Sequence, residues 1–107
     1  MAELYDFIEN LWITDSHEHT VQEVERVSSE ADPLQIILSQ YASSDLISSG
    51  LSLEDYVRAL NLNVPLKERW RVIEPFWGKA KNTTYFEVIN IALNDLYGVS
   101  ELDENTI

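Results

Sequence analysis

The chain has 107 residues, a formal net charge of −12 and no cysteine. Its hydrophobic content of 45% is enough for one compact core but not for two. The lack of thiols excludes disulfides and thiolate metal sites from this sequence and fits a cytoplasmic location. Acids dominate both ends of the chain, so we expect no nucleic-acid partner, whose phosphates these ends would repel.

Neither a membrane span nor a secretion signal is visible in the sequence. No apolar run approaches the roughly 18 residues that a spanning helix needs. Residues 1–10 contain acids where a signal peptide carries positive charge. We therefore expect no membrane partner.

The first informative element is an apolar run that leads into the only two histidines. It predicts a β-strand over about residues 11–16, with Asp15 near its end and His17 and His19 beyond it, all at two-residue intervals. On an extended backbone these three side chains project from one face. Because imidazole is a common ligand of zinc, we predict that His17 and His19 bind a divalent metal ion, with Zn as the first choice. Asp15 is expected to orient a ligating imidazole. A solvated turn with two histidines, and a structural aspartate at a strand end, are the alternatives.

Helical patterns fill the remainder of the chain. Residues 20–31 permit either a weak amphipathic helix or a loop. A clearer helix begins with Asp32 as N-cap before a proline and continues as an apolar stripe to Tyr41. We expect a break at the serine pair 43–44 and an end at Gly50.

Three further helices are expected, opening at Ser52, Pro65 and Thr84. Pro75 should kink or end the second of them, because it lacks a backbone donor and clashes with the preceding turn. Residues 84–87 form a capping box for the last helix, and Gly98 is its expected C-terminal cap. The predicted fold class is mainly α, with one N-terminal strand followed by four or five helices in a single unit.

The string ITDSHEHT at residues 13–20 resembles the first barrel strand of the amidohydrolase superfamily, in the branch near the uronate isomerases. Residues 40–46, 65–70 and 94–99 resemble the helical insertion of that branch. The resemblance implies that residues 1–20 are the first strand with its metal motif and that residues 32–98 are the insertion. A (β/α)₈ barrel needs about 250 residues. The resemblance therefore implies the N-terminal part of a longer, metal-dependent TIM-barrel enzyme.

For that parent enzyme the resemblance implies hydrolysis of an amide, ester or similar bond in a small-molecule substrate. The metal would activate water or polarise a carbonyl. Sugar-acid isomerisation, as in a uronate isomerase, and decarboxylation are the alternatives. The catalytic base and the remaining ligands cannot be assigned in this sequence, so the 107-residue chain alone is expected to be inactive.

The resemblance of residues 40–46 and 65–70 to the insertion also implies four candidate substrate contacts, because an insertion after the first strand emerges at the rim of a barrel, where active sites lie. They are Tyr41, Asp45, Arg69 and Trp70. Tyr41 and Trp70 also lie on apolar stripes, and Asp45 and Arg69 also suit surface or ion-paired positions. Structural roles therefore remain open for all four.

The main alternative is not an enzyme. An acidic helical module could bind another protein through exposed aromatic side chains, with Trp12, Trp70, Trp77, Tyr85 and Phe86 as candidates. The two interpretations differ in metal content, because only the first requires an ion at His17 and His19.

Overall fold

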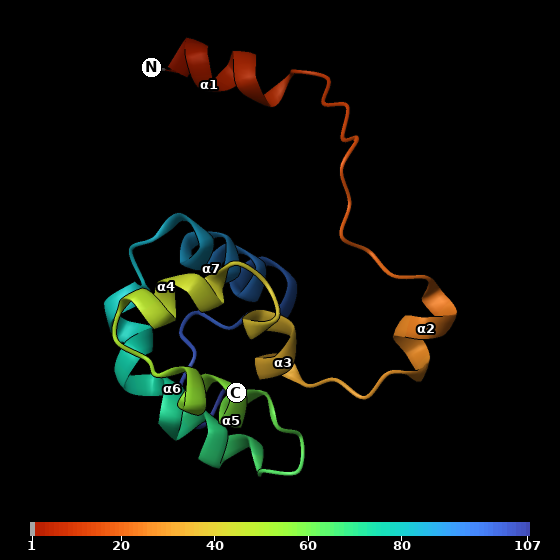
Figure 1. Cartoon of the computed structure of the whole chain (residues 1–107). Helices are drawn as coiled ribbons and strands as arrows, with labels where there is room; N and C mark the ends of the chain where they lie inside the picture. Colours follow the sequence, from red (N-terminus) through yellow and green to blue (C-terminus); the bar gives the residue numbers. More distant parts are fainter. Residues whose placement is uncertain (1) are drawn as a thin grey trace.

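The computed structural model describes residues 2–107, and within that range the chain forms helices and no β-strand (Figure 1). The helices are α1 (Ala2–Glu9), α2 (Glu23–Ser28), α3 (Pro33–Leu38), α4 (Ala42–Ser48), α5 (Leu53–Leu60), α6 (Leu66–Ala80) and α7 (Thr84–Tyr97). The predicted mainly α character is confirmed, and the predicted strand over residues 11–16 is wrong.

The segment that was expected to form the strand is extended but unpaired. A β-strand requires a neighbouring strand to receive its backbone hydrogen bonds, and an isolated one leaves them to water. The other described residues form helices, turns and short connections, so none of them offers such a neighbour. The apolar run at residues 11–13 therefore stays outside any sheet.

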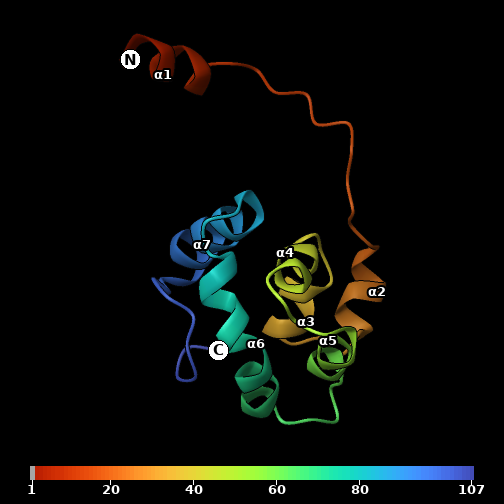
Figure 2. The same cartoon turned by 60° about the vertical axis from the view of Figure 1, so that its left-hand side comes forward.

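The chain divides into an N-terminal arm, defined as residues 2–22, and a helical body. The arm consists of α1 and an extended segment that holds α1 away from the body (Figures 1 and 2). Every residue from 2 to 31 is exposed. The radius of gyration is 16.2 Å, whereas a compact domain of this length has a radius of about 13 Å. The arm accounts for this excess.

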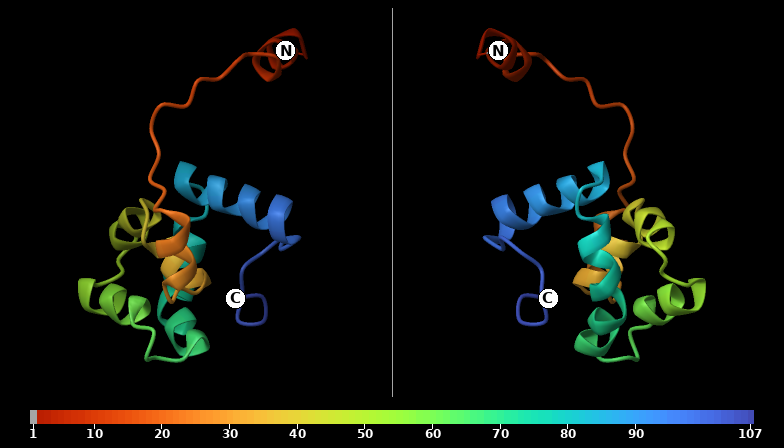
Figure 3. Two further views of the ribbon diagram at one scale, coloured as in Figure 1. Left: turned by 90° about the vertical axis from the view of Figure 1, so that its right-hand side faces the viewer. Right: turned by 90° about the vertical axis from the view of Figure 1, so that its left-hand side faces the viewer.

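Helix α6 is the central element of the body and contacts both α4 and α5. α4 also contacts α7, and the tail after α7 turns back towards the other helices (Figure 3). Two edge-to-face contacts join Trp70 to Trp77 and Trp77 to Phe86, with ring centroids 5.4 and 4.6 Å apart. The buried core is Leu34, Leu38, Ala42, Leu46, Leu51, Ala59, Trp70, Ile73, Trp77, Ala80, Phe86 and Leu102.

Helix α3 begins as the sequence predicts, but the break after it comes earlier. The Asp32 carboxylate accepts the backbone N–H of Gln35 at 3.0 Å, so this N-cap is confirmed. α3 ends at Leu38 rather than at the expected serine pair 43–44. At this point the Ser39 hydroxyl donates to the carbonyl of Ile36 at 3.0 Å, a local bond that competes with helix continuation.

The predicted capping box at residues 84–87 is wrong, because the N-cap of α7 is Thr83. Its hydroxyl makes no cap hydrogen bond and donates instead to the Asp45 carboxylate at 2.5 Å, which ties α7 to α4. Pro75 does not end α6, which is helical on both sides of it. Gly98 is confirmed as the C-cap of α7 and has a left-handed backbone with φ of 67°.

Candidate metal centre

The two histidines lie in the exposed segment between α1 and α2, and their rings converge. The Nε2 atoms of His17 and His19 are 2.7 Å apart, and the ring planes make an angle of 64°. Both rings can meet because residues two apart on an extended backbone project from the same face. At this distance the two Nε2 atoms share a hydrogen bond, in which one ring donates its N–H and the other accepts through its unprotonated nitrogen.

The spacing of the two nitrogens fits a shared metal ion after a small adjustment. Two nitrogens bound to one tetrahedral zinc at about 2.0–2.1 Å lie about 3.3 Å from each other. The pair would have to open by about 0.6 Å from its present 2.7 Å. Both side chains are exposed, so rotation of the rings can provide this without disturbing the core.

Asp15 acts on the backbone of the segment. Its Oδ1 accepts the backbone N–H of His17 at 3.1 Å, which forms a local turn around the first histidine. It thereby positions His17 through the main chain, where the sequence predicted a contact with an imidazole. Asp15 and Glu18 also place two carboxylates in the same short stretch, which favours a cation there.

The ligand set offered by residues 2–107 is incomplete. No group of three or more histidine, cysteine, aspartate or glutamate side chains in this range is arranged to hold a metal ion. Zinc in proteins takes three protein ligands at catalytic sites and four at structural sites. The two imidazoles therefore provide about half of a coordination sphere.

An aromatic pair on the body lies beside His19. The ring of His19 meets Tyr41 edge-on at a centroid distance of 6.4 Å, and Tyr41 stacks on Tyr85 at 5.3 Å. Tyr41 precedes α4 and Tyr85 lies in the first turn of α7, so the arm touches the body where these two helices begin. The sequence indicates Tyr85 as a protein-binding aromatic but does not predict that it lies near the histidines, because it is far from His19 along the chain and no local spacing links the two.

The other three candidate substrate contacts have structural partners. Asp45 accepts the hydroxyl of Thr83 at 2.5 Å. Arg69 is only 2% exposed and Trp70 only 1% exposed, so both belong to the interior of the body. Of the four candidates, Tyr41 alone is seen in contact with the histidine pair.

Arg69 joins three parts of the body. Its Nε donates to the carbonyl of Val64 at 2.8 Å, one terminal nitrogen donates to the carbonyl of Ala59 at 3.2 Å, and its guanidinium pairs with Asp32. Burial by itself raises the pKa of Asp32. The hydrogen bonds from Arg69 and Gln35, together with the charge of Arg69, outweigh this and lower the pKa of Asp32 below its ordinary value.

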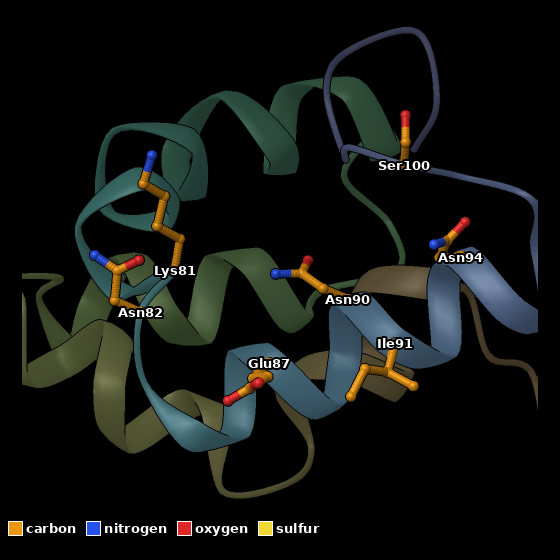
Figure 4. Close-up of a pocket in the computed structure, with 7 residues that line it drawn as sticks. All are labelled: Lys81, Asn82, Glu87, Asn90, Ile91, Asn94 and Ser100. Atoms are coloured by element: carbon orange, nitrogen blue, oxygen red, sulfur yellow. The ribbon is translucent and has the colours of Figure 1, made fainter. Parts of the chain in front are cut away.

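The surface hollows of the body include two that the histidines do not line. One, of about 330 Å³, is mainly apolar and lies between the start of α3, the end of α7 and the tail. The other, of about 540 Å³, is open and polar (Figure 4). Its lining is Lys81, Asn82, Glu87, Asn90, Ile91, Asn94 and Ser100.

No protein-family model, curated protein or solved structure matches the chain. Among residues 2–107, no helix has both the length and the apolar character required to cross a bilayer.

Proposed function

We propose that His17 and His19 are two ligands of a divalent metal ion, with Zn as the first choice, in the N-terminal segment of an amidohydrolase-type metal-dependent hydrolase. The observation that supports this most directly is the convergence of their Nε2 atoms, 2.7 Å apart, on an exposed extended segment. In this proposal the remaining ligands and the general base are supplied from outside residues 2–107. The 107-residue chain alone is then inactive.

Each residue near the pair has a role in the proposal. His17 and His19 hold the ion, and Asp15 fixes the turn that presents His17. Tyr41 provides an aromatic wall beside His19 against which a small-molecule substrate can rest. When bound, a divalent ion at this position supplies Lewis-acid polarisation of a carbonyl or a lowered pKa of water. Sugar-acid isomerisation and decarboxylation use the same polarisation and are the alternative reactions.

The ligand assignment can be tested by competitive zinc titration of the chain and of the variants His17→Ala and His19→Ala. We expect weak binding by the unaltered chain and a loss of at least about tenfold in each variant, because one of only two imidazoles is removed. Thr20→Ala is the matched control, since Thr20 is exposed in the same segment but carries no imidazole. Equal zinc affinity in all four proteins would overturn the assignment.

The hydrolase part of the proposal requires a separate test. We would sequence the coding DNA beyond the codon for Ile107. An open frame that encodes further histidines and a late aspartate after strand-like segments supports a barrel enzyme. A stop codon directly after Ile107 would overturn the catalytic proposal and leave the metal-binding one.

A second candidate function is protein binding through the N-terminal arm. The observation that favours it is the exposure of apolar side chains on the arm, where Trp12 is 98% and Phe7 62% exposed. The structure buries Trp70, Trp77 and Phe86, so these three are not available to a partner. Capture of a partner by the chain, lost when Trp12 and Phe7 are both replaced by serine, would support this function.

A further inference from the structure

We infer that a second copy of this chain completes the metal centre, so that His17 and His19 of two chains place four imidazoles around one zinc ion. This inference rests on the proposed metal-binding role of the pair. The proposed function takes the remaining metal ligands from outside residues 2–107. For the 107-residue chain by itself, this inference names a second copy as their source.

The number of ligands favours this partner. Two imidazoles fill two of the four positions of a tetrahedral ion, and residues 2–107 contain no cluster that supplies a third ligand. A second copy brings the same two imidazoles in the same geometry. If a two-fold axis passes through the ion, the contact is closed and each chain contributes equally.

The position of the pair makes such an approach possible. Residues 10–22 run outside the helical body (Figures 2 and 3). Both histidines are exposed. The core residues all lie between 34 and 102. Two copies can therefore meet through their extended segments without displacing any core side chain.

The backbone and the apolar side chains next to the histidines gain from the same contact. The extended segment lacks a partner strand, and an antiparallel copy of it can supply the missing backbone hydrogen bonds. Val21 is 53% exposed and lies two residues beyond His19, on the same face of the extended segment. Pairing of the two segments would remove part of this side chain from water.

Charge makes the association depend on the ion. Each chain carries a net charge of −12, and Asp15 and Glu18 of both copies come close to the axis. These carboxylates repel one another when no cation is present. A divalent ion on the axis offsets this repulsion and holds the four imidazoles, so we expect monomers without zinc and dimers with it.

The test is sedimentation analysis of the full chain at fixed concentration, with and without zinc chloride, combined with a measurement of bound zinc. We expect the mass to double, one ion to be bound per two chains, and a chelator to reverse both changes.

Variants and a second ion provide the controls. His17→Ala and His19→Ala should stay monomeric, whereas Thr20→Ala should dimerise like the unaltered chain. Far-UV circular dichroism should be the same for all of them, since residues 17–20 contribute nothing to the core. Magnesium should leave the mass unchanged, because it prefers oxygen ligands to imidazole.

The outcomes separate this inference from the proposed function. One zinc per chain with no change in mass overturns the dimer and leaves the metal ligands in place. No zinc binding overturns both. A dimer that forms with magnesium, or that persists in the two histidine variants, shows that other groups join the chains and overturns the inference.

Discussion

Replacement of Arg69 by methionine should remove a large part of the stability of the body. The side chain is 2% exposed and donates to the carbonyls of Val64 and Ala59 at 2.8 and 3.2 Å, besides its pairing with Asp32. Methionine fills much of the volume but leaves two carbonyls and a carboxylate without their donor. Removal of one partner from a buried ion pair costs about 3–5 kcal/mol.

We expect the lower end of that range, about 3 kcal/mol, because the Asp32 side chain is 21% exposed and water can replace part of its lost partner. A domain has only about 5–15 kcal/mol of stability. The melting temperature should fall by roughly 12–24 °C. Urea denaturation followed by far-UV circular dichroism measures the free energy, and a thermal melt measures the midpoint.

Arg71→Met is the matched control, since it makes the same change two residues further along helix α6, at an exposed position. The side chains of Arg71 and its partner Glu104 are 62% and 40% exposed. Exposed ion pairs contribute below about 1 kcal/mol. If Arg69→Met costs no more than Arg71→Met, the argument that Arg69 stabilises the body is refuted.

Three further variants test the acid sensitivity of Asp32 and the backbone at two glycines. The pKa of Asp32 is lower in the folded protein than its ordinary value of 3.8. The stabilisation of the fold by the Asp32 carboxylate is therefore complete above pH 3.8 and is lost as pH falls through the folded-state pKa. At neutral pH the urea midpoint of Asp32→Asn should therefore be lower than that of the unaltered chain. Between neutral and acid pH the midpoint of the variant should fall less than that of the unaltered chain, and an equally steep fall would contradict this reasoning. Gly98→Ala should destabilise the body by about 1 kcal/mol because φ is 67° there. Gly78→Ala, in helix α6 with no atom within 4 Å of an added Cβ, should stabilise it by about 0.5–1 kcal/mol, and thermal melts that reverse this order would contradict the reasoning.

The helices could be predicted from the sequence because their signals are local. The N-cap at Asp32 and the glycine after α7 act within one turn, and both lie where the pattern placed them. The start of α7 was predicted less well, because the hydroxyl of Thr83 bonds to Asp45 on another helix. A competing contact of this kind cannot be read from neighbouring residues.

The strand over residues 11–16 failed for a different reason. An apolar extended run indicates what the side chains prefer, but a strand forms only when another strand pairs with it. No segment of residues 2–107 does so. The backbone spacing still brings His17 and His19 together, since it requires an extended chain and not a sheet. The neighbourhood of Tyr41 and Tyr85 arises from tertiary packing and could not be predicted.

The separation of the arm from the body has a thermodynamic consequence. A ligand raises the melting temperature only when it binds the folded state more tightly than the unfolded one. His17 and His19 lie on an extended, solvent-exposed segment that contributes no side chain to the core and touches the body through the rings of His19 and Tyr41. An ion bound there should associate almost equally well after the body has melted. Zinc should therefore leave the melting temperature nearly unchanged, and a thermal-shift screen would overlook the one site that this chain is best suited to form.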